Sequence, residues 1–184
     1  MERLTIEPLI NFSELQSFEC GIEEMDNFIH NGLYQSVQNC YCRMYAVHDA
    51  NNVLIAFFAL SFDSLRLDTD DIEDLQNGWT DTTIPCPTQD YLDTFWSKVH
   101  YPALEIAYLA VHKDYRNQHI GKTIIAEIEK MAHNQQLAGC QFLTVGAYVS
   151  KEYNAIGFYT KCGFAKAEPV PVRDTLRMYY NLLN

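Results

Sequence analysis

The sequence has 184 residues, a length that fits one domain or one domain with an insertion. Hydrophobic residues make up 48% and charged residues 20%, as in ordinary globular proteins, and no apolar run approaches the ~20 residues of a membrane-spanning helix. The formal net charge of −11 argues against broad binding to nucleic-acid phosphates and is compatible with a cationic substrate.

The first hundred residues predict a helix followed by a hairpin. Residues 21–39 place Ile22, Met25, Ile29, Leu33 and Val37 at helical spacing, which predicts one amphipathic helix with an apolar face. Residues 41–49 and 53–67 are rich in aromatic and branched side chains, and the turn-forming residues between them predict a β-hairpin.

The chain changes character between about residues 68 and 87. Residues 68–74 hold five acids and no base, and Gly and Pro follow, so we expect an insertion or long loop within a single domain spanning 1–184. Residues 88–101 then predict a helix with Thr88 as a candidate N-cap.

The second half alternates strands and helices. Residues 103–111 form an apolar run interrupted only by Glu105, which predicts a buried central strand. We expect a helix over about 121–136, a strand over 140–149, a short helix over 152–164 closed by Gly163, and a final strand over 175–183. This order predicts an α/β arrangement around a mixed sheet.

Cysteine and histidine usage gives no sign of a metal site. The six cysteines form no CxxC pair and have no zinc spacing with histidine, so we expect reduced, mostly buried thiols and no bound metal. The N-terminal residues lack a basic segment followed by an apolar one, so we expect no export signal and a cytoplasmic location.

The segment after the 103–111 strand resembles a phosphate-binding loop. Gly121, Lys122 and Thr123 match the end of the nucleotide-triphosphate loop, but Arg116 stands where its first glycine belongs, so ATP is rejected. A strand that leads into a helix start still presents unpaired amides and a positive dipole end, which suit a pyrophosphate. A plain strand-to-helix connection is the alternative on this segment alone.

Two motifs together are more specific. Residues 109–125 hold Arg116, His119 and Gly121 in the Arg/Gln-x-x-Gly-x-Gly/Ala pattern that follows a Leu-Ala-Val strand end. Residues 154–164 match Ala-x-x-Phe/Leu-Tyr-x-x-x-Gly-Phe. In both respects the chain resembles the GCN5-related N-acetyltransferases (GNAT family), over about residues 101–183. At His119 it departs from the pattern, because glycine is usual there.

The resemblance implies a fold and a ligand. The fold is α/β (α+β), the acyl-CoA N-acyltransferase fold, with a mixed, centrally splayed sheet flanked by helices. The ligand is acetyl-CoA as co-substrate, or another acyl-CoA. Its pantetheine arm pairs with the strand end, its pyrophosphate binds the following turn, and Asn154 is a further candidate contact. The implied binding residues are Leu109, Ala110, Val111, Arg116, Asn117, Gln118, His119, Ile120, Gly121, Lys122, Thr123 and Asn154.

The resemblance also implies catalytic roles. The family places a tyrosine beside the sulfur of coenzyme A, and Tyr159 fills that slot as the donor of a proton to the leaving thiolate. Glu105, the only charge in its strand, is the candidate general base, with a structural glutamate paired to Arg or Lys as the equal alternative. Asp63 and Tyr108 are weaker candidates for the base.

The acceptor stays open at this point. A primary amine of a small molecule or a protein is preferred, with no membrane partner and nucleic acid unlikely. Residues 18–29 and 101–111 resemble the toxin-type branch of the family, which acetylates aminoacyl-tRNA, but that branch is usually basic. A non-catalytic acyl-CoA sensor or partner-binding module is the alternative from another class. The oligomeric state is open, with a homodimer as one alternative.

Overall fold

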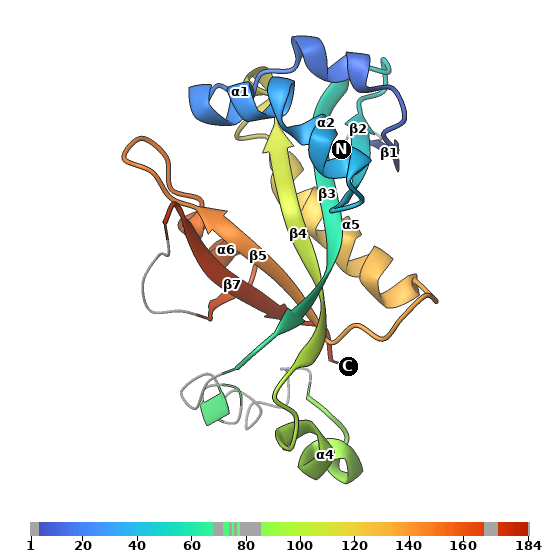
Figure 1. The fold of residues 1–184 in the computed structure, drawn as a ribbon, viewed down its shortest axis with the longest axis vertical. Helices are drawn as coiled ribbons and strands as arrows, with labels where there is room; N and C mark the ends of the chain where they lie inside the picture. The colour runs from blue at the N-terminus through green and yellow to red at the C-terminus, as the bar shows by residue number, and fades with distance from the viewer. Residues whose placement is uncertain are drawn as a thin grey trace. The chain divides into compact units, whose positions relative to one another are not determined.

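The computed structural model describes residues 4–67, 72, 73, 75, 77, 86–167 and 173–183 (Figure 1). Seven strands in this part of the chain form a mixed sheet in the order β1-β2-β3-β4-β5-β7-β6. They are β1 Thr5–Pro8, β2 Arg43–His48, β3 Leu54–Leu65, β4 Tyr101–Val111, β5 Phe142–Tyr148, β6 Ala165–Lys166 and β7 Thr175–Asn181. The mixed α/β prediction is therefore confirmed.

The described helices are of two kinds. The α-helices are α1 Glu23–Asn31, α2 Leu33–Gln38, α4 Leu92–Trp96, α5 Ile120–Asn134 and α6 Ile156–Lys161. The 3-10 helices are η1 Phe12–Ser17, η2 Gln89–Tyr91 and η3 Lys113–Tyr115. None of the described helices combines the length and apolar character that crossing a membrane requires.

The chain forms two compact units, and strands β3 and β4 contribute residues to both. Unit 1 comprises the described residues of Met1–Ser61 with Ile106–Glu127, and unit 2 those of Phe62–Glu105 with Ile128–Asn184. The expectation of one domain over 1–184 stays a prediction. Most of the predicted acidic insertion at 68–87 lies outside the described residues.

Unit 1 is built on the predicted hairpin. Strand β2 pairs antiparallel with β3, and the Asp49 side chain accepts the amides of Asn51 and Val53 in the turn between them, both at 2.9 Å. Strand β1, which the sequence did not suggest, pairs antiparallel with β2. Its four residues are mostly exposed, so its sequence carries little burial pattern.

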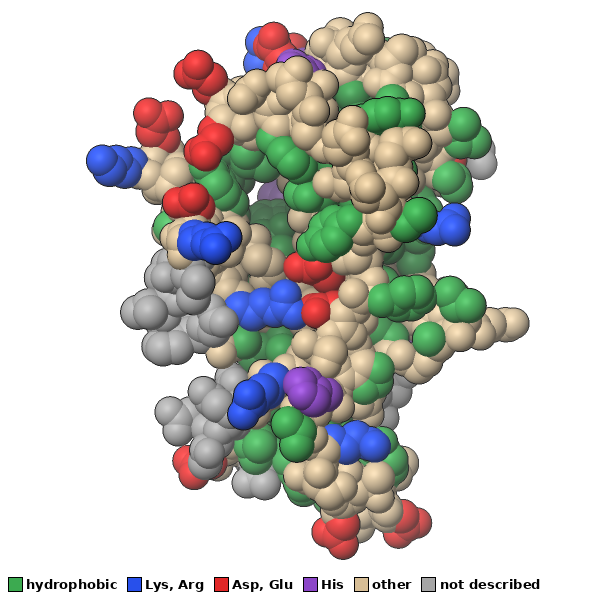
Figure 2. All heavy atoms as spheres, in the orientation of Figure 1, with side chains coloured by type: hydrophobic (Ala, Val, Ile, Leu, Met, Phe, Trp, Pro, Cys, Tyr) green, Lys and Arg blue, Asp and Glu red, His purple; other side chains and the backbone are tan. Residues whose placement is uncertain are grey.

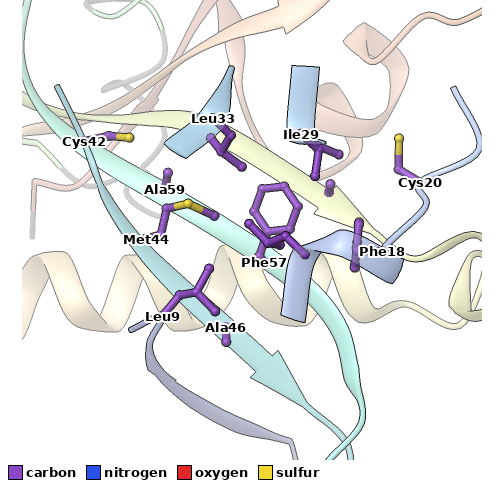
Figure 3. Packing of buried hydrophobic residues seen from close by; sticks show 12 residues of the cluster. Leu9, Phe18, Cys20, Ile29, Leu33, Cys42, Met44, Ala46, Phe57 and Ala59 are labelled. Carbon is purple, nitrogen blue, oxygen red and sulfur yellow. The ribbon is translucent and has the colours of Figure 1, made fainter. Parts of the chain in front are cut away.

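The predicted helix over 21–39 is two helices, α1 and α2, separated at Gly32. A Cβ at this glycine would lie 2.7 Å from the ring of Phe28, so Gly32 leaves the space that this ring occupies. The apolar face is nevertheless as predicted: Ile29 and Leu33 are buried in one core with Met44 and Phe57 of the strands (Figure 3).

Unit 2 has its own core, around Phe95, Tyr101, Phe142 and Tyr179. The predicted helix over 88–101 is only η2 followed by α4, and the Thr88 side chain makes no capping hydrogen bond. The chain leaves the helix early because Tyr101 already belongs to β4, where its hydroxyl donates to the Phe95 carbonyl at 3.0 Å.

The C-terminal strands of unit 2 follow the predicted order. Strand β5 pairs antiparallel with β7 along its whole length, and β7 also pairs with β6 (Figure 1). Helix α6 ends before Gly163, which has φ +90° and lies with its Cβ position 3.1 Å from the Tyr180 ring. The prediction that Gly163 closes this helix is confirmed.

The expectation of mostly buried cysteines is wrong. The six cysteines, all within the described residues, form no disulfide with one another, but only Cys20 and Cys42 are buried. Cys40 and Cys86 are exposed, because the loops that hold them lie at the surface rather than in either core.

Candidate active site

The turn that connects β4 to α5 lies in unit 1. Helix η3 follows the strand, and α5 then starts at Ile120. The His119 carbonyl accepts the Thr123 amide at 3.0 Å and the Thr123 hydroxyl at 3.3 Å, so His119 opens the hydrogen-bond ladder of the helix. By helix geometry, the preceding amides of residues 120–122 have no acceptor inside α5. They fit an anionic group such as a diphosphate.

The backbone of this turn explains the glycine slot. His119 has φ +61°, in the left-handed region, and so does Asn117. Glycine adopts this conformation freely, whereas a side chain costs about 1–2 kcal/mol there. His119 therefore keeps the conformation that a glycine would have in the motif. Its side chain is exposed, and residues 117 and 118 are exposed beside it.

Because of this backbone conformation, different substitutions at position 119 should change the free energy of unfolding by different amounts. We expect His119→Gly to leave the free energy of unfolding within about 1 kcal/mol of wild type, because strain relief and unfolded-state entropy oppose each other. His119→Val should lower it by about 1–2 kcal/mol, since a β-branched residue tolerates positive φ poorly. Urea denaturation measures both.

A matched control for this comparison is Lys122→Val, at an exposed position within α5 that lacks positive φ. Only the helix propensity of valine acts there, at about 0.5 kcal/mol. If His119→Val cost no more than Lys122→Val, positive φ at position 119 would not be a constraint.

Residues 19–26 fix the start of this turn, a role that the sequence analysis missed. The Lys113 amide donates to the Glu19 carbonyl at 2.9 Å, and the two side chains form an ion pair. A hydrogen bond from Lys113 lowers the pKa of Glu19. Gly21, at φ +78°, approaches closely, with its Cβ position 3.3 Å from the Lys113 Cβ. The only signal in the sequence was the likeness of residues 18–29 to the toxin-type branch.

The Asp26 carboxylate holds this segment together. It accepts the amides of Cys20 at 2.6 Å and Gly21 at 2.9 Å. Burial opposes ionisation of Asp26, but hydrogen bonds from Cys20 and Gly21 outweigh it and lower the pKa. Burial raises the pKa of the Cys20 thiol to about 11, so this cysteine is protonated at neutral pH. It acts in packing and not as a nucleophile.

Tyr159 lies in unit 2, on helix α6. This helix follows β5 directly, because the Ala155 amide donates to the Tyr148 carbonyl at 2.9 Å. Tyr159 is 6% exposed and packs edge-on against Phe158 and Phe164. Burial raises the pKa of Tyr159 far above its ordinary value, so the phenol keeps its proton throughout the physiological range. A protonated phenol can act as a proton donor.

Glu105 is paired to an arginine, as one of the two alternatives expected for it, and it belongs to a charged cluster in unit 2 whose other members the sequence did not reveal. Arg177 on β7 forms ion pairs with Asp63 on β3 and, at 3.4 Å, with Glu105 on β4. The buried hydroxyl of Thr144 on β5 donates to the same Asp63 oxygen. The three charged side chains are 19–25% exposed. We call Asp63, Glu105, Thr144 and Arg177 the four-strand network.

The four-strand network lies where the parallel pairing of β4 with β5 ends. Among the described residues, this ladder has only the pairs Ala103–Phe142, Leu104–Leu143 and Glu105–Thr144, although β4 continues to Val111. Pairing that stops partway along two neighbouring strands is what a centrally splayed sheet requires.

The remaining candidate residues occupy different surroundings. Residues 109–111 form the end of β4 in unit 1, with Ala110 buried. Asn154 is exposed in unit 2, and its side-chain oxygen accepts the Ile156 amide at 2.9 Å. This bond leaves its amide nitrogen as the group that can reach a ligand. In the described part of the chain, no three His, Cys, Asp or Glu side chains gather as metal ligands would.

Comparison with known proteins agrees with this arrangement. Residues 89–166 match the family model of the acetyltransferase (GNAT) domain. No curated protein matched the sequence. The fold is similar to that of a bacterial toxin, with a TM-score of 0.70 and 16% identity over 99% of this chain and 92% of that one.

Two further solved structures are of the toxin AtaT. A tyrosine-to-phenylalanine mutant bound to acetyl-CoA and to the C-terminus of the antitoxin AtaR has a TM-score of 0.65 and 18% identity, over 97% of this chain and 93% of that one. AtaT complexed with acetyl-methionyl-tRNAfMet has a TM-score of 0.65 and 20% identity, over 97% and 95%. At identities this low, the structural similarity establishes a shared fold and nothing more.

The fold and the matched domain define an N-acetyltransferase, a class that uses acetyl-CoA as co-substrate. The match of residues 89–166 to the GNAT domain model agrees with the family resemblance seen in the sequence. The AtaT complex with a tRNA does not support the expectation that nucleic acid is an unlikely partner.

Proposed function

We propose that the protein transfers the acetyl group of acetyl-CoA to a primary amine of a small molecule or a protein, by direct attack of the amine. The observation that carries the proposal is Tyr159, a buried phenol on the helix after β5 whose pKa is raised by burial. A phenol that keeps its proton at neutral pH can give it to a leaving thiolate.

The binding roles follow the two motifs. The turn of residues 116–123 holds the diphosphate of acetyl-CoA, because the amides of residues 120–122 at the start of α5 supply donors without an acceptor in the helix, together with its positive dipole end. The backbone of Leu109, Ala110 and Val111 pairs with the pantetheine arm. The Asn154 amide nitrogen is an additional donor.

The chemical roles complete the proposal. The amine nitrogen attacks the thioester carbon, a C–N bond forms, and the Val111 amide donates to the developing oxyanion. As the C–S bond breaks, the Tyr159 hydroxyl gives its proton to the leaving sulfur. Glu105 takes a proton from the nitrogen, directly or through water, and Arg177 holds one of its oxygens in place. Proton return from the amine side to Tyr159 through solvent restores the enzyme.

A second acceptor, an aminoacyl-tRNA, is favoured by one observation. AtaT, which shares the fold, has been solved with acetyl-methionyl-tRNAfMet. The net charge of −11 points the other way, because a tRNA binder must neutralise phosphates. Because of this net charge, we rank a small amine or a protein amino group above aminoacyl-tRNA as the acceptor.

Salt dependence separates the two acceptors. We expect thiol release from acetyl-CoA with small polyamines or a lysine-containing peptide, at a rate that changes less than about threefold between 50 and 200 mM salt. With aminoacyl-tRNA as the true acceptor, the rate would fall on the order of a thousandfold over that range. Mass spectrometry of the products identifies the acetylated group in each case. If the protein acetylated aminoacyl-tRNA but no small amine or peptide, the proposed acceptor would be wrong and aminoacyl-tRNA would take its place.

A further inference from the structure

The turn that we assign to the diphosphate begins with an exposed backbone in uncommon conformations. Asn117 and His119 both have φ +61° and are exposed together with Gln118, and the preceding helix η3 is only three residues long. A segment of this kind binds a ligand tightly only if other contacts hold it in the bound conformation beforehand. In the described part of unit 1, residues 18–21 supply such contacts, and we call them the bracing segment.

The bracing segment runs beside residues 112–116, which lead into the turn. The Phe18 ring packs edge-on against the His112 ring, with centroids 5.5 Å apart at an interplanar angle of 79°. The carbonyl of the next residue, Glu19, accepts the Lys113 amide at 2.9 Å. One apolar contact and one backbone hydrogen bond therefore fix two successive residues just before the turn.

Gly21 extends these contacts to the first residue of the turn. A Cβ at this position would lie 3.3 Å from the Lys113 Cβ and 3.9 Å from Nη1 of Arg116. The backbone of Gly21 thus lies directly against the side chain of Arg116. A shift of Gly21 would therefore reach the residue with which the diphosphate turn begins.

Helix α1 holds the bracing segment in place through two of its side chains. The two carboxylate oxygens of Asp26 accept the amides of Cys20 at 2.6 Å and Gly21 at 2.9 Å, one amide each. His30, one turn further along the helix, donates through Nε2 to the Phe18 carbonyl at 2.9 Å. Hydrogen bonds to a carboxylate are stronger than those between neutral groups, so Asp26 is the main holder of residues 20 and 21.

Asp26 differs from the other acids of its helix. Glu23 and Glu24 are exposed, and Figure 2 shows acidic side chains at the surface over α1, whereas Asp26 is half-buried and turned toward the bracing segment. The helix itself is anchored in the core of unit 1 by Ile29, which is buried. Asp26 therefore connects the core, through the bracing segment, to the turn.

We propose that Asp26 is a positioning residue for acyl-CoA binding, which holds the diphosphate turn in its binding conformation through the bracing segment. The inference rests on the proposed function, which assigns residues 116–123 to the diphosphate. When the turn adopts this conformation for a smaller fraction of the time, the apparent dissociation constant rises in proportion. The diphosphate does not react, so its contacts are lost equally from the ground state and the transition state, and KM rises while kcat does not change.

Removal of the Asp26 carboxylate tests the proposal in the whole protein. Asp26→Ala should weaken the affinity for coenzyme A, measured by calorimetry, by about three- to tenfold. Pantetheine, which lacks the diphosphate, should bind the variant and wild type with affinities within about twofold of each other in NMR titrations. In thiol-release kinetics, the KM for acetyl-CoA should rise by the same factor as the dissociation constant of coenzyme A, with kcat within about twofold of wild type.

Asp49→Ala is the matched control. Asp49 also accepts two backbone amides in unit 1, those of Asn51 and Val53, but in the turn between β2 and β3, which has no part in the proposal. Its loss should leave the affinity for coenzyme A unchanged. If Asp26→Ala does not fold, Asp26→Asn replaces it. This variant keeps one of the two acceptor oxygens and should still weaken the affinity for coenzyme A by at least about twofold.

Three results would overturn the positioning role and leave the proposed function in place. They are an unchanged coenzyme A affinity in the Asp26 variant, an equal loss of pantetheine affinity, and an equal loss of coenzyme A affinity in Asp49→Ala. The last two would mean general damage to unit 1. If wild type binds coenzyme A but acetylates no amine, the proposed acceptor is wrong, and the binding measurements alone decide the role of Asp26. A wild type that does not bind coenzyme A would remove both proposals.

Discussion

Replacing Tyr159 by phenylalanine should lower kcat by about 10²–10³-fold while leaving the affinity for acetyl-CoA within about twofold of wild type. The substitution removes one oxygen from a buried ring and leaves its packing against Phe158 and Phe164 in place. Without that hydroxyl the thiolate must leave unprotonated or wait for water. Thiol-release kinetics measure kcat, and calorimetry with coenzyme A measures affinity.

Tyr180→Phe is the matched control for this prediction. The Tyr180 hydroxyl donates to Glu129 at 3.1 Å, and Tyr180 has no proposed role in transfer. Its loss should cost about 1 kcal/mol of stability and leave kcat unchanged. Equal kcat in wild type and Tyr159→Phe would remove Tyr159 from the chemistry, and a parallel fall in both variants would mean that the fold, and not proton donation, had been damaged.

The second large effect concerns the stability of unit 2. Arg177→Met should lower the free energy of unfolding by about 2–4 kcal/mol, because it leaves two mostly buried carboxylates without their shared cation. The Thr144 hydroxyl is a neutral donor to Asp63 and cannot replace the lost charge. Urea denaturation at neutral pH measures the change.

A double-mutant cycle isolates this interaction. Asp63→Asn alone breaks the same ion pair, and the double variant removes both partners, so its cost should be smaller than the sum of the two single costs by about 1 kcal/mol or more. Strict additivity would show that Arg177 and Asp63 do not stabilise one another. A cost below about 0.5 kcal/mol for Arg177→Met would place the whole network among weak surface pairs.

Periodicity and motif spacing predicted most of the elements, because each has a strong local pattern. The elements that escaped prediction are short. Strand β1 has four residues and β6 has two, and each exists through its pairing with a neighbouring strand. The predicted 21–39 helix is divided at Gly32, where the Phe28 ring occupies the space of a side chain, and helical spacing of apolar residues does not report such a break.

The residues of the candidate site were likewise predicted only in part. The motifs located the turn at 116–123 and Tyr159, since backbone conformation and ring packing there are encoded within a few residues. The partners of Glu105 were not visible, because Arg177 lies 72 residues further on in the chain and the ion pair forms only when β4 and β7 join one sheet. The positive φ of His119 became clear only from the backbone.

The boundary between the two units has a practical meaning for dissecting the protein. The chain passes from one unit to the other after residues 61, 105 and 127, and these positions fall inside β3, β4 and α5. A fragment cut at any of them would expose half a strand or half a helix, so neither unit can be expressed as a separable module. Tags and fluorescent insertions belong instead in connections such as residues 135–141, between α5 and β5.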